Sequence, residues 1–241
     1  MFWTSIVDGI GMFFSHWEIW VGILIYGTIF LTYFLLFGFA LSKGGDNRGV
    51  EMAGCLIHLI AGPALQGILV SFLVTAIFPI LCGGDDFISL SFLTENWWAI
   101  TKAGLISICI TLLLSSTPFV DSFIYSTPGT SIFVQGVIVF RMLANKVLFE
   151  VLDKINPNAD IFLGFWTLVG LLILSFVIHF IISSGLMLLL INLEIISSDP
   201  MESMDFVIDN IIGVFPGILC LCIYCSFIRL TFLNIPPTIT S

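Results

Sequence analysis

Two histidines stand inside long apolar stretches, where an imidazole side chain could ligate a haem iron. His58 and His179 belong to different stretches, and two histidines on separate helices can hold a b-type haem between them. The expected depths do not match, because at 1.5 Å per residue His58 lies about 8 Å and His179 about 28 Å from the inner ends of their helices. We therefore expect both imidazoles to bond to neighbouring helices, and we predict no cofactor.

Cysteine thiols are the next candidates for chemistry, and all six occupy or end apolar runs. They are Cys55, Cys82, Cys109, Cys220, Cys222 and Cys225. The last three are closely spaced, but a structural zinc site needs further ligands and the sequence supplies no second set. A disulfide framework would place cysteines in polar loops. We therefore interpret the cysteines as small buried hydrophobic residues and predict no metal site.

Polar residues within apolar segments are the remaining candidates. The sequence contains no P-loop, nucleophile elbow or HExxH motif, so we predict no enzymatic activity. Proline interrupts two segments, and the carbonyls freed at such kinks can face water. Asp209 either marks the start of a helix, where negative charge suits the dipole, or lines a vestibule. The residues expected to line a pathway or to pack between helices are His58, Pro63, Gln66, Arg141, Asn145, His179, Asp209 and Pro216.

The composition decides which class of protein must position these residues. Hydrophobic residues make up 59% of the 241 residues and charged residues 10%, and the mean hydropathy is +1.15. A soluble domain is about 45–50% apolar and about 25% charged, so a soluble enzyme and a disordered chain are both excluded. We predict an all-α polytopic integral membrane protein. The net charge of −9 argues against nucleic acid as a partner, because phosphate binding needs clustered Lys and Arg.

Five apolar segments are long enough to cross a bilayer, which takes about 20 apolar residues in a helix. They form a single membrane domain over residues 1–241. The second and fourth segments exceed the bilayer thickness, so they should tilt, kink or project beyond it. The predicted transmembrane helices cover residues 19–41, 53–82, 98–120, 160–193 and 206–231.

Basic residues orient these five helices. If residue 1 lies outside, six Lys and Arg residues, Arg229 among them, fall on the inner side, and only Lys102 lies near the outer face. This distribution satisfies the positive-inside rule. Acidic residues, Asp8 among them, and the tryptophans at positions 17, 20, 97 and 98 then gather at the outer side. We predict an outer N-terminus and an inner C-terminus and, from the short loops, a bacterial inner membrane.

Two further helices are predicted beside the five spans. In residues 1–17, apolar residues recur at three- and four-residue steps with Asp8 and other polar residues between them, which predicts an amphipathic helix in the outer interface. Residues 131–155 carry a second apolar stripe. A span there would place Arg141 near mid-membrane, at a cost of about 2.5–3.5 kcal/mol. We therefore predict an inner-surface helix, or a re-entrant helix packed between spans.

Residues 141–145 read Arg-Met-Leu-Ala-Asn. This motif resembles the Arg-Leu-x-Ala-Asn core of the proton-channel subunit a of rotary ATP synthases, a family that in bacteria also has five spans, an outer N-terminus and an inner C-terminus. The resemblance covers these five residues. In that family the arginine lies in a long apolar helix, whereas here Lys146 follows at once, and the family's glutamine-bearing last helix is not evident at 206–231. The resemblance implies a divergent proton-channel subunit as one alternative, and no residue role is carried over.

The sequence as a whole favours a non-catalytic, membrane-embedded subunit of a larger membrane protein complex. It has no catalytic motif, no soluble domain and short loops, as expected of a subunit of a secretion or conjugation channel or of an energy-transducing assembly. The plan of about five spans with an outer N-terminus is similar to that of the inner-membrane channel component of type IV secretion systems. The lipid bilayer and other membrane subunits are the expected partners.

A small transporter or channel is the main alternative. Residues 19–82 and 160–231 would form two proline-kinked hairpins that run in opposite directions, as in an inverted repeat with a substrate site between its halves. Pro63, Gln66, His179 and Pro216 would then surround a hydrated cavity. A b-type haem electron carrier is a further alternative.

Overall fold

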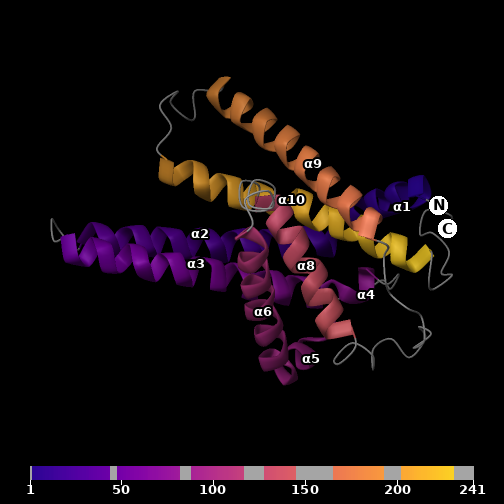
Figure 1. The fold of residues 1–241 in the computed structure, drawn as a ribbon, viewed down its shortest axis with the longest axis horizontal. Helices are drawn as coiled ribbons and strands as arrows, with labels where there is room; N and C mark the ends of the chain where they lie inside the picture. The colour runs from indigo at the N-terminus through magenta and orange to yellow at the C-terminus, as the bar shows by residue number, and fades with distance from the viewer. Residues whose placement is uncertain are drawn as a thin grey trace.

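The computed structural model describes residues 2–43, 48–81, 88–116, 128–144, 165–192 and 202–230, which are almost entirely helical and contain no strand. The prediction of an all-α protein is thereby confirmed for this part of the chain. The helices, drawn in Figure 1, are α1 (Phe2–Ser15), α2 (Trp17–Lys43), α3 (Arg48–Ala76), α4 (Phe78–Leu81), α5 (Leu90–Glu95), α6 (Trp97–Ser115), α8 (Pro128–Ala144), α9 (Phe165–Asn192) and α10 (Glu202–Ile228).

The five longest of these helices coincide with the five predicted spans. Within the described residues, three helices are long and apolar enough to cross a membrane, namely α2, α3 and α6, over Trp17–Phe37, Leu59–Ala76 and Trp97–Leu114. Shorter apolar helical segments lie in α8, α9 and α10. Their length and composition are compatible with an integral membrane protein. The number of membrane crossings, about five, stays a prediction.

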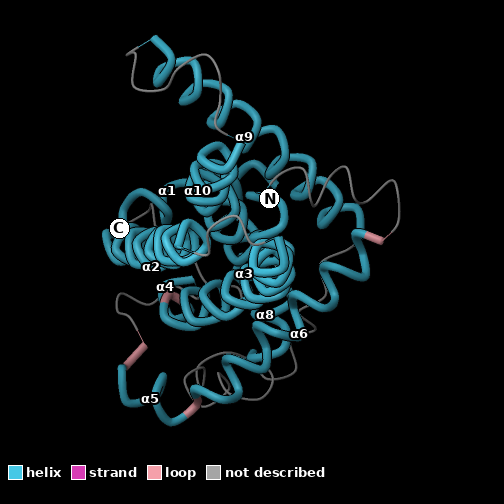
Figure 2. The backbone as a smooth tube through the Cα atoms, turned by 90° about the vertical axis from the view of Figure 1, so that its left-hand side faces the viewer, coloured by secondary structure: helices cyan, strands magenta, loops and turns pink. Residues whose placement is uncertain are grey.

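Helix α10 forms the centre of the packing. It contacts α8, α1, α9 and α2, and nearly every described side chain from Val214 to Arg229 is buried. Helices α2, α3 and α10 run along nearly the same line in Figure 1 and are seen nearly end-on in Figure 2, whereas α6 crosses them steeply. An all-round apolar helix such as α10 is typical of the middle of a bundle.

Helix α8 lies inside the bundle and not on its surface. It packs against α10, α6, α3 and α9, and it buries Ile132, Phe133, Val139, Phe140 and Leu143. The prediction of an inner-surface helix is therefore wrong for residues 128–144, and packing between long helices, the second possibility, describes them. A single apolar stripe suggested one buried face, but Gln135 and Gly136 on other faces are buried as well. The rest of the predicted helix, residues 145–155, lies outside the described residues.

The two proline-bearing hairpins run in the same direction. The ends of α2 and α3 at Lys43 and Arg48 lie on the same side of the molecule as the ends of α9 and α10 at Asn192 and Glu202 (left in Figure 1). The inverted arrangement expected from the sequence is therefore not what the structure shows. Helix α8, which follows α6 and precedes α9 in the chain and packs against both, adds a change of direction between the two hairpins.

The crossing of α3 and α6 depends on two glycines. A Cβ at Gly67 would lie 2.6 Å from the Gly104 carbonyl oxygen, and one at Gly104 would lie 2.5 Å from that of Gly67. The Ser71 hydroxyl beside this contact donates to the Ile100 carbonyl over 2.6 Å. Small residues that let backbones approach, with a hydroxyl bonded across, are typical of helix pairs in membranes.

Candidate functional site

A buried polar cluster joins the first and last described helices. It consists of Asp8 on α1, Ser226 on α10 and Arg229 at the end of α10, and we call it the Asp8 cluster. The Asp8 carboxylate accepts hydrogen bonds from the Ser226 hydroxyl and from the Arg229 guanidinium group, with which it forms a salt bridge. The side chains of Asp8 and Arg229 are each 1% exposed, so water screens this ion pair very little.

The Asp8 cluster forms because α1 packs antiparallel along α10. At one end the Phe13 and Phe215 ring centroids lie 4.8 Å apart. In the middle, a Cβ at Gly9 would lie 2.5 Å from the Ile223 Cα, so only glycine permits this approach. The Asp8 carboxylate is thereby brought to the last turn of α10. A buried charge is stable only when it is paired and hydrogen-bonded, and this packing supplies both partners.

Helix α1 buries part of the polar stripe that the prediction turned towards water. The helix itself is confirmed, but its polar residues Ser5 and Asp8 are buried, while the apolar residues Trp3, Val7 and Phe14 are exposed. An amphipathic helix in the membrane interface would direct its polar residues to water. The structure therefore corrects the prediction, since α1 packs on α10 through a mixed face of Asp8, Gly9 and Phe13, while Trp3, Val7 and Phe14 face outward. An apolar outer face suits lipid better than water.

The sequence does not reveal the Asp8 cluster, because the positive-inside rule places Asp8 and Arg229 on opposite sides of the membrane. Asp8 was placed with the outer acidic residues and Arg229 with the inner basic ones, yet they are in contact. A usable signal exists: each is a charged residue within an otherwise apolar helix, and such a residue usually has a buried partner of opposite sign. The cluster can hold α1 to the core.

A second contact point lies where α8 and α10 meet. A Cβ at Gly129 would lie 2.8 Å from the Pro216 ring and 3.1 Å from His179 Nδ1 on α9, and one at Gly213 would lie 2.8 Å from the Gly129 nitrogen. We call this contact of Pro128, Gly129, His179, Gly213 and Pro216 the glycine–proline junction. A proline within a membrane helix leaves a backbone carbonyl without its usual hydrogen bond, and a closely packed neighbouring helix makes this tolerable.

The structure brings together two of the residues singled out in the sequence, His179 and Pro216, at the glycine–proline junction. Pro63 and Gln66 are half-buried on α3. Arg141 is half-buried on α8. The side chains of His58 on α3 and Asp209 on α10, and all of Asn145, lie outside the described residues.

Three cysteines of α10 are buried, as the sequence suggested. Cys220 and Cys222 are fully buried and Cys225 nearly so, whereas Cys109 on α6 is exposed. Burial limits thiol reactivity because the reagent must reach a thiolate. A variant that keeps only the three α10 cysteines should react with a membrane-permeant maleimide at least about tenfold more slowly than a variant that keeps only Cys109. Mass spectrometry of the folded protein in detergent measures both rates.

Unfolding in SDS provides the control for this labelling experiment, because it should make the two variants react at similar rates per thiol. Equal rates before unfolding would contradict the burial of α10.

Comparisons of this chain with protein-family models, with curated proteins and with solved structures found no match.

Proposed function

We propose that this chain is a non-catalytic, membrane-embedded subunit of a larger membrane protein complex, located in a bacterial inner membrane. The observation that carries the proposal is the far part of the α2–α3 hairpin, which extends beyond the other helices (Figure 1). The other described helices leave many of its apolar side chains exposed. They include Leu35, Leu36, Phe39, Leu56, Leu59 and Ile60.

These exposed residues do not lie on one face. Leu35 and Leu36 are adjacent in α2, as are Leu59 and Ile60 in α3, and adjacent residues of a helix point in directions about 100° apart. The far part of the hairpin is therefore apolar on several sides, and α10 and α8, which form the centre of the packing, do not cover it. Such a hairpin suits insertion between lipid and a second membrane protein.

A ladder of aromatic rings along α2 favours a protein partner over lipid alone. Tyr26 stacks on Phe30 with ring centroids 5.8 Å apart, Phe30 contacts Phe34, and Tyr33 contacts Phe34 and Phe37. Aromatic residues are enriched in protein–protein interfaces, where they contribute much contact area at small entropic cost. The ladder begins in the packed part of the molecule and continues into the exposed part.

A site-specific photo-crosslinker tests this proposal in the native membrane. Positions Leu36 and Ile60 on the hairpin are 64% and 72% exposed, and Leu113 on α6, at 70%, is the matched control. We expect crosslinks to another membrane protein from the hairpin positions and none to protein from Leu113. Gentle detergent extraction should then release a stoichiometric complex that contains that protein.

Lipid adducts alone at all three positions, together with a lone chain of 26.6 kDa after extraction, would overturn the subunit proposal.

A small transporter or channel is the second candidate, and one observation favours it. His179 and Pro216, two of the four residues expected around a hydrated cavity, meet at Gly129. A homo-oligomer on extraction, with solute flux in liposomes that His179→Ala abolishes, would support this candidate over the subunit.

A further inference from the structure

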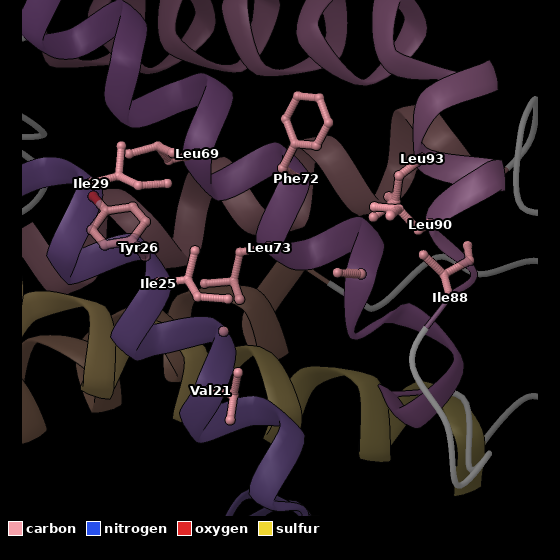
Figure 3. Close-up of a pocket in the computed structure, with 12 residues that line it drawn as sticks. Val21, Ile25, Tyr26, Ile29, Leu69, Phe72, Leu73, Ile88, Leu90 and Leu93 are labelled. Carbon is pink, nitrogen blue, oxygen red and sulfur yellow. The ribbon is translucent and has the colours of Figure 1, made fainter.

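An open pocket of about 440 Å³ lies between α2 and α3 and is bordered by Ile88 and α5 (Figure 3). Its lining comes from residues 21–29 of α2, 69–76 of α3, and 88–93. Among the twelve lining residues, Tyr26 has the one polar side-chain atom. The volume falls within the range of about 300–1,000 Å³ typical of ligand pockets. The lining therefore suits an apolar ligand.

The pocket lies at the level of two candidate membrane spans. Its α2 residues fall within Trp17–Phe37 and its α3 residues within Leu59–Ala76, both long and apolar enough to cross a bilayer. Ile25 and Ile29 on its rim are exposed, so the pocket opens to the surroundings of the helices. In a membrane those surroundings are lipid chains.

Exposed tryptophans mark one end of the pocket. Trp17 lies one turn before Val21 on α2, and Trp97 and Trp98 begin α6 just after Leu93 of α5. Tryptophan is enriched where membrane meets water. From this end the pocket follows α2 from Val21 to Ile29, which is about 12 Å at 1.5 Å per residue.

We infer that this pocket binds one acyl chain of a membrane phospholipid, with the lipid head group at the tryptophan end. The pocket is apolar, follows α2 for about 12 Å and opens to the surroundings of the helices, which suits a single flexible chain. A flexible chain fits and covers the apolar lining. Each buried methylene group adds to the affinity, so the bound lipid should remain after mild extraction.

Tyr26 tests the identity of the ligand at the inner end of the pocket. Its hydroxyl is buried and has no hydrogen-bond partner among the residues that the structure describes. An acyl chain that enters from the tryptophan end presents only methylene groups there. Tyr26→Phe should therefore leave lipid affinity unchanged, whereas a ligand with a carbonyl or hydroxyl at that end would lose a hydrogen bond.

Native mass spectrometry of the delipidated full chain, titrated with dioleoyl phosphatidylcholine in mild detergent, measures the binding. Ile25→Trp should fill the pocket and weaken the first binding step by about tenfold or more, as expected when at least two methylene groups are excluded. The matched control is Ile173→Trp on α9, because Ile25 and Ile173 are 55% and 51% exposed and Ile173 lies outside the pocket. Dihexanoyl phosphatidylcholine should bind more weakly than the dioleoyl lipid.

Wild-type affinity in Ile25→Trp, or an equal loss in Ile173→Trp, would overturn the assignment of the pocket to a lipid chain. A large loss in Tyr26→Phe would overturn it in favour of a ligand with a polar group at the inner end.

Discussion

Replacing Arg229 with methionine should lower the free energy of unfolding by about 3–5 kcal/mol, because it leaves the Asp8 carboxylate buried without its ionic partner. Asp8 and Arg229 are each 1% exposed, so water cannot solvate the charge that remains. Asp8→Asn should have an effect of the same sign, since it leaves the guanidinium group buried. Thermal unfolding in detergent micelles, followed by tryptophan fluorescence, measures the change.

The double variant Asp8→Leu with Arg229→Met separates the cost of an unpaired charge from the loss of contact area. Replacing both ions of a buried pair by apolar residues is often neutral, so we expect the double variant to be more stable than either single variant. Lys102→Met is the control, because Lys102 is exposed and surface substitutions stay within about 0.5 kcal/mol. A double variant as unstable as Arg229→Met would mean that shape, not charge, holds α1 to α10.

The long helices could be predicted because their apolar runs are local. Segments such as 19–41 and 98–120 exceed the length of an ordinary buried strand or helix and match α2 and α6 within a few residues. Helix α8 shows where this reasoning stops. Its helical pattern was visible in the sequence, but the cost of burying Arg141 argued for the surface. The structure leaves Arg141 half-buried near the end of the described helix, so most of α8 is buried without placing this charge in the centre.

The orientation of α1 could not be predicted from its pattern. Periodicity identifies a polar stripe and an apolar stripe, but it does not say which stripe faces inward. In water the apolar stripe turns to the core, whereas a helix surrounded by lipid can bind the core through its polar stripe. In α1, Ser5 and Asp8 of the polar stripe are buried together with Met12 and Phe13. The choice depends on Arg229, a residue 221 positions away.

The glycine–proline junction was predictable in part. Pro216 and His179 were identified because proline and histidine are unusual inside apolar helices. Their proximity depends on Gly129, which lets the start of α8 pack against both residues. A glycine has no side chain that would identify it as part of such a contact in the sequence. Only the packing of α8 against α9 and α10 reveals that these three positions belong together.

Gly213→Ala should destabilise the fold by about 1–3 kcal/mol, the usual effect of overpacking a tight contact. The added Cβ would lie 2.7 Å from the Pro128 Cβ and 2.8 Å from the Gly129 nitrogen. Backbone atoms and a proline ring cannot move aside as a flexible side chain can. Helices α8 and α10 would have to separate, and His179 would lose its position against Pro216.

Gly170→Ala and Gly185→Ala on α9 provide the matched controls, because a Cβ at either position meets nothing within 4 Å. Glycine within a helix is less favourable than alanine by about 0.5–1 kcal/mol, so both controls should leave stability unchanged or raise it slightly. The same chemical change thus has opposite expected signs at Gly213 and Gly170. If all three variants unfolded at the same temperature, α8 and α10 would not be in backbone contact, and the proximity of His179 to Pro216 would lose its structural basis.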